Sequence, residues 1–379
     1  MRIALFTEAY APQVNGVVRT QLELVRFLRS RGHQVLLGVP RNKANPPQEQ
    51  VVAFKCVPFP LYPEMPIILP HWSFHRREFA QVEAFKPDLV HLMSPGVLAY
   101  FGQLWARRHG CRVVASYETD ITRYLHYYGF GVFEPQLWRY LRWLYNHCQQ
   151  TYVPSRVTQE QLIKGGIHDV RVFERGVDCE QFHPSKRSDA VRKAFGVEPG
   201  GTLVLYAGRL SKEKSLEVLL KAFTRLTGEL PKARLVVAGE GPYRRALVRS
   251  FRSPAITFIS WKQGEELAAL FASADLFALP SSTETLSLVS LESMASGVPV
   301  LAMNAGGVRD IVGHDSTGLL ANSAEDFEAC LGRLLKDSDL RARLGLKGRT
   351  YAESKTWTHA FEALEQNYLE VLGQKVQGV

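Results

Sequence analysis

The chain contains no run of about 18 uncharged apolar residues, so the sequence predicts no membrane-spanning helix. Its first residues, MRIALFTEA, have neither the long apolar stretch nor the small-residue cleavage site of a secretory signal peptide. A low-complexity tail is also absent. These absences predict a cytoplasmic protein.

Cysteines are few and scattered, with no C-x-x-C pair and no cluster with histidine at metal-ligand spacing. An odd number of cysteines without framework spacing indicates reduced thiols and argues against a zinc site. We interpret the cysteines as packing residues. They are Cys56, Cys111, Cys148, Cys179 and Cys330.

The length of 379 residues exceeds one typical domain and predicts two. Apolar residues make up 46% and charged residues 22%, as in soluble globular proteins. The net charge of +9 is uneven, because residues 1–184 carry +6 and the remainder +3. A basic N-terminal half could attract nucleic acid, anionic lipid or a phosphorylated substrate, and the sign alone does not choose among them.

Short apolar runs alternate with helical patterns in two series, which predicts two parallel sheets covered on both faces. We therefore predict an α/β protein with two doubly wound, Rossmann-like domains, at 1–184 and 185–356, facing each other across a ligand-binding cleft. The basic stretch 182–188 is the expected linker. The C-terminal helix, 357–379, is expected to pack back onto the first domain. The expected strands are RIALFT, GHQVLLGVP, VVAFKCVPF, DLVHLM, RVVASY and TYVPS in the first series, and TLVLYAG, RLVVAG, ITFIS, DLFALP and VPVLA in the second.

Two glutamates, Glu284 and Glu292, stand eight residues apart in SSTETLSLVSLESMASGVPVLA. Glu284 follows a predicted strand, and Glu292 lies about one turn into a helix that begins near Ser287. Loops at strand carboxyl ends form the crevice of an open α/β sheet, so a carboxylate there could hold ligand hydroxyls. The amides of the helix start, residues 286–288, could bind phosphate oxygens. Alternatively, Glu284 only caps the helix and Glu292 lies on its solvent face.

Positive charge follows the first strand of the second series, in AGRLSKEKSLE. A departing diphosphate needs fixed cations where negative charge grows, and Arg209 offers a planar fork while Lys214 offers a point charge. The alternative is a solvated basic loop without a ligand.

Three motifs together, AGRLSKEKSLE, VVAGEGPYR and ETLSLVSLESMASGVPVLAMNAGGVRDIV, resemble those of the retaining glycosyltransferases of family four, which have the two-domain GT-B fold. The resemblance extends to NGVVRTQLELVRFLRSRGHQV, KPDLVHLMSPGVLAY and RGVDCEQFHP, and so covers nearly the whole chain. Within the family the chain is similar to bacterial GDP-mannose-dependent α-mannosyltransferases and to sulfoquinovosyl-diacylglycerol synthases. The resemblance implies that no metal or other cofactor is needed.

The resemblance also implies roles for individual residues. Arg209 and Lys214 would grip the donor diphosphate and stabilise the leaving group. Glu284 would face the transferred sugar, and Glu292 would accept hydrogen bonds from the nucleotide ribose. These residues are the implied centre of catalysis and donor binding.

Smaller residues would shape the donor site. The helix start at Ser287 and Leu288 would present its amides to phosphate. Gly16 would let the backbone of the first domain approach the donor, and the alternative for Gly16 is a plain turn glycine. Gly239 and Gly241 would form the wall beside the base, or would simply end a strand.

The chain departs from the family pattern at several positions. Many members carry a histidine after the fifth strand of the first domain, where this chain has Glu118, with Asp120 two residues on. A carboxylate must be protonated to donate a hydrogen bond as a neutral imidazole does, so these two are either sugar or acceptor contacts or structural residues. Soon after the first glutamate, where the family usually has a glycine, this chain has Ser287. After the third strand of the second domain, Ser260 or Trp261 stands where the family usually has a glycine, which leaves the identity of the donor's nucleotide base open.

The segment 123–146, RYLHYYGFGVFEPQLWRYLRWLYN, is predicted to form a long aromatic helix. It mixes Arg123, Arg139 and Arg142 with tryptophans and tyrosines, which suits a helix lying on anionic lipid. Together with HWSFHRREF at 71–79 it could present a lipid acceptor. The alternative is that these aromatics form core.

We therefore expect a retaining glycosyltransferase that moves a hexosyl group, with mannose from GDP-mannose as first choice, to a lipid or glycolipid acceptor. It would act at the inner face of the cell membrane as a peripheral protein. The alternatives are a UDP-sugar-dependent glycolipid or sulfoquinovosyl-type synthase, and a catalytically silent sugar-nucleotide-binding scaffold. Nucleic acid is not an expected partner, because no binding motif accompanies the basic charge.

Overall fold

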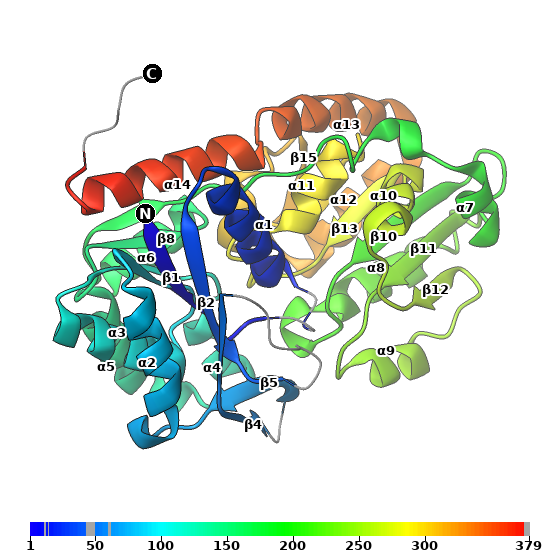
Figure 1. The fold of residues 1–379 in the computed structure, drawn as a ribbon. Coiled ribbons are helices and arrows are strands. Elements are labelled where there is room, and N and C mark those ends of the chain that lie inside the picture. Colours follow the sequence, from blue (N-terminus) through cyan, green and yellow to red (C-terminus); the bar gives the residue numbers. More distant parts are fainter. Residues whose placement is uncertain (11–12, 14, 43–49, 60–61, 375–379) are drawn as a thin grey trace. The chain divides into compact units, whose positions relative to one another are not determined.

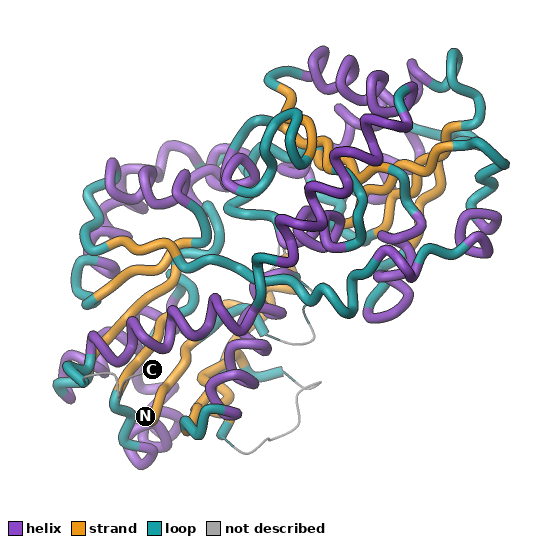
Figure 2. Tube along the Cα trace, turned by 90° about the horizontal axis from the view of Figure 1, so that it is seen from above, coloured by secondary structure: helices purple, strands orange, loops and turns teal. Residues whose placement is uncertain are grey.

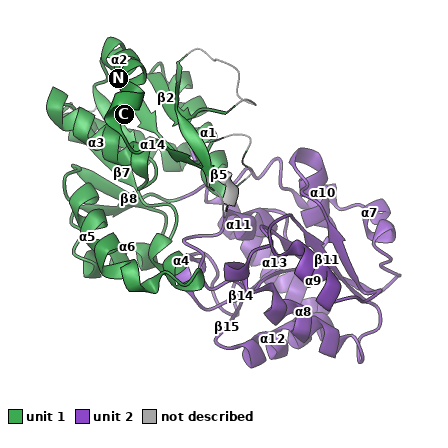
Figure 3. Cartoon of the chain, turned by 90° about the horizontal axis from the view of Figure 1, so that it is seen from below, with its two compact units in different colours: residues 1–174, 358–379 green, residues 175–357 purple. Residues whose placement is uncertain are grey.

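The computed structural model describes residues 1–10, 13, 15–42, 50–59 and 62–374. The chain forms two compact units, residues 1–174 with 358–379 and residues 175–357 (Figure 3). It therefore passes from one unit to the other after Glu174 and returns after Trp357. Residues 375–379 of the predicted C-terminal helix, and part of the predicted loop before the first helix, lie outside the described residues.

The first unit is built on a seven-stranded parallel sheet with the strand order β3-β2-β1-β6-β7-β8-β9. In its centre, Ile3 of β1 lies opposite Val35 of β2 on one side and Leu89 of β6 on the other. The strands are β1 (Arg2–Phe6), β2 (Gln34–Pro40), β3 (Val51–Phe54), β6 (Leu89–Leu92), β7 (Arg112–Ser116), β8 (Gln150–Val153) and β9 (Val170–Val172).

Helices cover both faces of this sheet, because its central strands are apolar on both sides (Figures 1 and 2). Ala4 and Phe6 of β1 belong to the core beneath α2, α3 and α5. On the opposite face α1 and α14 pack together, with the rings of Phe27 and Phe361 5.5 Å apart. The helices are α1 (Gly16–Ser30), α2 (Arg76–Phe85), α3 (Val97–His109), α4 (Ile121–Tyr127), α5 (Glu134–Tyr145), α6 (Arg156–Lys164) and α14 (Trp357–Val371).

Buried hydrogen bonds fix α14 to the first unit. The Nδ1 atom of His91 lies 2.6 Å from the Tyr368 hydroxyl, and its Nε2 atom lies 2.8 Å from the Ser116 hydroxyl. Glu365 of the same helix lies 2.6 Å from Nε2 of His33. Polar side chains therefore help to decide where this helix docks, because a buried polar group requires a matching partner.

The second unit is built on a six-stranded parallel sheet with the order β12-β11-β10-β13-β14-β15. Leu205 of β10 lies opposite Val236 of β11 and Phe277 of β13. The strands are β10 (Thr202–Ala207), β11 (Ala233–Ala238), β12 (Ile256–Ile259), β13 (Leu276–Leu279), β14 (Val300–Met303) and β15 (Gly318–Ala321). The helices are α7 (Asp189–Ala194), α8 (Leu216–Leu226), α9 (Arg244–Ser250), α10 (Gly264–Ser273), α11 (Leu288–Ala295), α12 (Ala324–Lys336) and α13 (Ser338–Glu353).

The stretch 182–188, which we expected to be a linker, is packed onto the second unit. Phe182 is buried in that unit's core. Lys186 pairs with Glu265 at 2.7 Å, and Arg187 pairs with Asp275 at 2.6 Å. Its basic residues therefore serve local ion pairs, and the chain leaves the first unit before this stretch begins.

Two sequence-based element predictions are wrong. The run VVAFKCVPF is not one strand, because it divides into β3 and β4 (Cys56–Phe59), and β4 pairs in antiparallel fashion with β5 (Tyr62–Ile68) in a separate sheet. The long aromatic helix is also interrupted. It forms α4, a 3₁₀ turn at Gly131–Phe133 and α5, with Gly129 between them at a φ of 79°. Strands β5, β9 and β15 were not predicted.

Across the described ranges, none of the helices has the length and apolar content needed to span a membrane. The five cysteines are unpaired. Burial raises the pKa of the Cys111 thiol to about 11, so it stays protonated at neutral pH. This agrees with the interpretation of the cysteines as packing residues.

Replacing Tyr368 with Phe should destabilise the first unit by about 1–3 kcal/mol, because buried His91 then loses a hydrogen-bond partner. Urea unfolding followed by circular dichroism measures the change. Tyr100→Phe is the control, since Tyr100 is 39% exposed on α3 of the same unit. Equal stability of the two variants would contradict a role for the His91 contact in docking α14.

Candidate functional site

The strand order of the second unit reverses between β10 and β13. Strands β11 and β12 lie beyond β10, whereas β14 and β15 lie beyond β13. Loops that follow two such neighbouring strands diverge, which opens a crevice at their carboxyl ends. Arg209 and Lys214 follow β10, and Glu284 follows β13. The topology therefore brings the predicted cations and the predicted carboxylate to one edge of the sheet.

Lys214 and Glu284 form an ion pair across this edge, with Nζ 2.7 Å from Oε1. Their side chains are 17% and 14% exposed. A second contact joins the same loops, because the Thr283 hydroxyl donates to the carbonyl oxygen of Glu213 at 3.3 Å. The alternative of a solvated basic loop is therefore wrong for Lys214, which is largely shielded and paired.

Arg209 is half-buried at the start of the same loop. Burial lowers the pKa of its guanidinium, and the negative charge of Glu213 opposes this shift. Glu213 is buried and accepts a hydrogen bond from the Ser211 hydroxyl at 2.5 Å. Sequence analysis missed Glu213. Its position between the two cations, in the motif SKEK, was the available signal.

A backbone contact holds the Glu284 main chain in place. The amide of Gly307 donates to the carbonyl oxygen of Glu284 at 2.7 Å. Gly306 has a φ of 63°, and a Cβ atom there would collide with the same carbonyl oxygen. Only glycine allows so close an approach in this conformation. Gly306 and Gly307 were not predicted as site residues, although they stand in the motif NAGGV after β14.

Helix α11 begins directly after this loop. Ser287 is its N-cap and accepts a hydrogen bond from the amide of Ser290, and Leu288 is its first residue. Glu292 is only 4% exposed. The alternative in which Glu284 caps the helix and Glu292 faces solvent is therefore wrong.

Ser287 adopts a φ of 115° and a ψ of 85°, a conformation that a residue with a side chain rarely adopts. This explains why a glycine suits the position in the family pattern. The serine compensates in part, because its hydroxyl caps the helix and lies 2.8 Å from the Ser290 hydroxyl. The chain therefore combines backbone strain with a buried helix cap at this position.

Gly239 and Gly241 follow β11 and pack against the loop after β10. A Cβ atom at Gly239 would collide with the carbonyl oxygen of Gly208, and one at Gly241 with that of Leu210. The amide of Leu210 also donates to the carbonyl oxygen of Glu240 at 2.9 Å. Both glycines therefore have a structural reason that needs no ligand, and they fix the backbone that carries Arg209.

In the first unit, Gly16 is the exposed first residue of α1, whose N-cap is Asn15. Glu118 and Asp120 follow β7 and are buried, with exposures of 9% and 5%. Asp120 caps α4 and accepts hydrogen bonds from the Thr122 hydroxyl at 2.6 Å and from the side-chain amide of Gln161 at 3.1 Å. Asp120 thus has a structural role as the cap of α4.

Glu8 is a carboxylate that sequence analysis missed. It follows β1, where the strand order of the first unit reverses between β1 and β6. Its Oε1 atom accepts a hydrogen bond from the amide of Leu98 at 2.8 Å, at the start of α3. Burial raises the pKa of Glu8 to about 7. In the sequence, the only indication that Glu8 is a site residue was its place directly after the first strand, in FTEAY.

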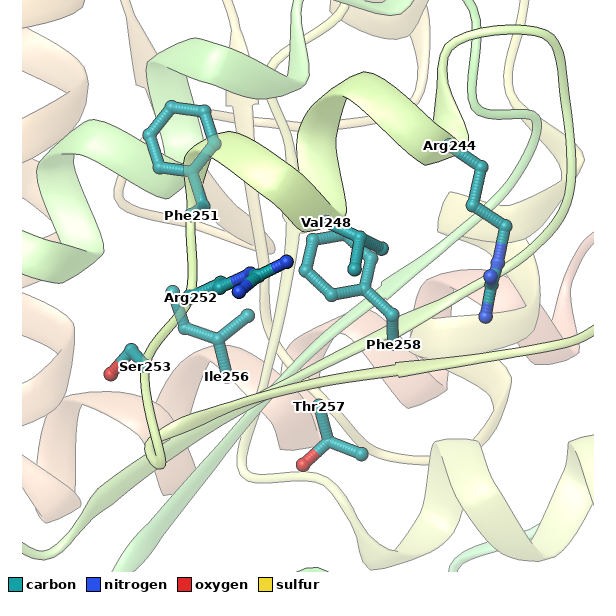
Figure 4. Close-up of a pocket in the computed structure, with 8 residues that line it drawn as sticks. All are labelled: Arg244, Val248, Phe251, Arg252, Ser253, Ile256, Thr257 and Phe258. Atoms are coloured by element: carbon teal, nitrogen blue, oxygen red, sulfur yellow. The ribbon is translucent and has the colours of Figure 1, made fainter.

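A cavity of about 390 Å³ opens between α9 and β12 in the second unit (Figure 4). Arg244 and Arg252 line it together with the apolar side chains of Val248, Ile256 and Phe258. None of the predicted site residues lines it. In the parts of the chain that the structure describes, no group of three or more His, Cys, Asp or Glu side chains could hold a metal ion.

Replacing Ser287 with Gly should stabilise the second unit by about 1 kcal/mol, since relief of backbone strain outweighs the lost cap and the added freedom of the unfolded chain. Thermal unfolding should show a rise in Tm of about 2–4 °C. Ser296→Gly is the matched control at the other end of α11, where φ is −80° and glycine relieves nothing. A lower Tm for Ser287→Gly would mean that the cap, not the strain, dominates.

Comparison with known families matches both halves of the chain. Residues 14–181 match the family described as Glycosyltransferase Family 4, and residues 188–351 match Glycosyl transferases group 1. The sulfoquinovosyl transferase SQD2 of Arabidopsis thaliana is 35% identical over 95% of this chain and 71% of its own. A GDP-mannose-dependent alpha-mannosyltransferase of Mycolicibacterium smegmatis is 34% identical over 99% of both chains. The alpha-monoglucosyldiacylglycerol synthase of Streptococcus pneumoniae is 28% identical over 90% of this chain and 80% of its own.

Solved structures share the fold at lower identity. The sucrose-phosphate synthase of Thermosynechococcus elongatus superposes with a TM-score of 0.82 at 20% identity, covering 98% of this chain and 99% of that one. Anabaena HepE in complex with UDP-glucose superposes with a TM-score of 0.78 at 18% identity, covering 98% and 100%. These matches agree with the two parallel-sheet units. The chain belongs to glycosyltransferase family 4, and it is a sugar-nucleotide-dependent glycosyltransferase with the two Rossmann-like domains of the GT-B fold.

Proposed function

We propose that the protein transfers a hexosyl group, with retention of configuration, from a nucleoside-diphosphate sugar to a lipid-linked acceptor. GDP-mannose is the first-choice donor. The observation that carries the proposal is the pairing of Lys214 with Glu284 beside Arg209, where the strand order of the second unit reverses. The names of the GDP-mannose-dependent relative and of the diacylglycerol-glycosylating relative support the choice of donor and acceptor.

The donor contains a diphosphate, which suits cationic side chains, and sugar hydroxyls, which suit carboxylates. Arg209 and Lys214 would bind the diphosphate oxygens, and the amides at Ser287 and Leu288 would add to this binding at the helix N-terminus. Glu284 would accept hydrogen bonds from the sugar hydroxyls. Glu292, buried within α11, would accept those of the ribose. From the first domain, Gly16 would let the backbone approach the phosphates.

Donor binding would exchange the partner of Lys214. In the structure the lysine is paired with Glu284 at 2.7 Å. A diphosphate carries more negative charge than one carboxylate and would attract the lysine away from it. The released carboxylate would then face the sugar. This exchange keeps both groups paired before and during binding, so neither is left as an isolated charge in a shielded site.

The proposed reaction needs no side-chain nucleophile. The bond between the anomeric carbon and the diphosphate oxygen breaks, and the acceptor oxygen bonds to the same face of the sugar. The acceptor's hydroxyl proton passes to the leaving phosphate. Arg209 and Lys214 stabilise the charge that develops on the diphosphate, which is the part of the reaction where fixed cations have the greatest effect. These two residues supply positive charge without a cofactor.

A UDP-sugar-dependent synthase is the second candidate. The similarity to the sulfoquinovosyl transferase SQD2, at 35% identity, favours it. Ser260 or Trp261 stands where the family usually has a glycine, and this leaves open whether guanine or uracil fits the donor site. A silent scaffold is the third candidate, because Glu118 stands where many relatives have a histidine.

Purified protein should be stabilised by GDP and GDP-mannose more than by UDP and UDP-glucose in a thermal-shift series, since a ligand that binds only the folded state raises Tm. It should also transfer mannose from GDP-mannose to lipids of a bacterial membrane extract. Transfer from UDP-glucose or UDP-sulfoquinovose alone would support the second candidate. Donor binding without any transfer would support the scaffold.

Replacing Lys214 with Ala should lower kcat by about 10² or more if the lysine stabilises the leaving diphosphate, as for other lost transition-state charge contacts. Lys212→Ala is the matched control, because Lys212 is exposed in the same short 3₁₀ segment. Its kcat should stay near that of the wild type. An unchanged kcat in Lys214→Ala would remove the lysine from the mechanism.

A further inference from the structure

The connection between α4 and α5 exposes an unusual concentration of large apolar side chains. We name residues 127–133 the apolar tip. Val132 is 76% exposed and Phe133 is 55% exposed, and the remaining exposed members are Tyr127, Tyr128 and Phe130. Exposed apolar side chains normally occur singly on a soluble surface, so a cluster within one short segment indicates an interaction site.

The aromatic residues of α5 itself do not contribute to this surface. Trp138, Tyr140 and Trp143 are partly buried against the core of the first unit. At the other segment predicted to meet lipid, Trp72 stacks on buried Phe79 with ring centroids 4.4 Å apart. The aromatic side chains of α5 therefore pack against the core, as the alternative interpretation had it. The exposed apolar surface lies just before the N-terminal end of α5.

Local hydrogen bonds hold the apolar tip in shape. His126 at the end of α4 lies 2.8 Å from Glu134 at the start of α5, and Trp138 donates to the same carboxylate at 3.2 Å. Within the tip, the amide of Phe130 donates to the carbonyl oxygen of Leu125 at 2.7 Å. A segment that is ordered before it binds loses less conformational entropy on binding.

The charge around the apolar tip is positive. Residues 120–146 contain three arginines against Asp120 and Glu134, and Arg123 pairs with Asp120 at 3.3 Å. Arg139 and Arg142 are exposed and lie three residues apart, so they share one face of α5. Arg142 lies in the last turn of this helix and also donates to the carbonyl oxygen of Gly165 at 3.2 Å. Apolar side chains flanked by arginines match a membrane surface, where the apolar groups enter the headgroup region and the cations meet lipid phosphates.

We propose that the apolar tip inserts into the surface of an anionic lipid bilayer, with Arg139 and Arg142 against the lipid phosphates. The inference rests on the proposed lipid acceptor and names the part of the chain that meets the lipid. Helix α4 begins at Ile121 and is capped by Asp120, shortly after the carboxyl end of β7 and Glu118. A membrane held at the apolar tip would therefore lie one short helix away from the predicted acceptor-side residues of the first unit.

The test is vesicle sedimentation without any sugar nucleotide. Wild-type protein should bind vesicles of phosphatidylcholine mixed with phosphatidylglycerol more tightly than vesicles of phosphatidylcholine alone. The double variant Val132→Ser, Phe133→Ser should bind the mixed vesicles roughly tenfold less tightly or weaker, because it removes two large apolar side chains from the inserted surface. Its Tm should equal that of the wild type, since both side chains are exposed.

Leu346→Ser is the matched control, because Leu346 is 71% exposed on α13 of the second unit, outside the proposed lipid-facing surface. It should bind vesicles as the wild type does. The proposal is overturned if the double variant binds like the wild type, if the control loses as much binding, or if wild-type protein binds no vesicles. It is also overturned if the wild type forms dimers that the double variant cannot form, because the surface would then serve a second copy.

The outcome is separable from that of the proposed function. Vesicle binding is measured without donor or transfer, so a protein that binds vesicles through the apolar tip but transfers no sugar would contradict the proposed function alone. A protein that transfers sugar to detergent-dissolved acceptor, and whose double variant still sediments with vesicles, would contradict the apolar tip alone.

Discussion

The ion pair between Lys214 and Glu284 depends on a single constraint, the reversal of strand order between β10 and β13. The reversal makes two loops diverge from neighbouring strands, and the charged groups on those loops meet across the gap. The pair is shielded enough for its attraction to matter, and it keeps the partial exposure that the proposed exchange of partners requires. A fully buried pair could not release its lysine to a ligand without a large desolvation cost. The site's chemistry therefore follows from the sheet topology.

Close backbone packing supports this arrangement. Gly239, Gly241 and Gly306 stand where a Cβ atom would collide with a carbonyl oxygen of a neighbouring loop. Each contact fixes a loop that carries one of the predicted site residues. Ser287 is the exception, because it adopts a strained backbone conformation and offsets part of the strain with a helix cap. The loops are thus positioned by main-chain contacts.

The first unit uses its carboxylates differently. Asp120 is occupied by the cap of α4, whereas Glu8 lies at the strand reversal between β1 and β6 with a raised pKa. The same helix α4 leads from the edge of the sheet to the apolar tip. Sugar chemistry and lipid contact, as proposed, would therefore share one continuous segment of the chain. A lipid-linked acceptor requires such proximity, because its sugar cannot travel far from the membrane surface.

The sequence by itself determined the two α/β series, the family and the residues that carry charge, because strand periodicity and the order of motifs such as AGRLSKEKSLE are local properties. It could not separate α4 from α5, since the aromatic pattern continues through Gly129 and only tertiary packing shows which rings face the core. It also missed Glu8 and Glu213, whose surroundings come from distant segments or from the fold of a loop. Tertiary structure alone decided that Glu292 is buried, that Asp120 is a cap and that Lys214 meets Glu284, 70 residues further along the chain. Burial and long-range pairing depend on strand order, and strand order is not a local property of the sequence.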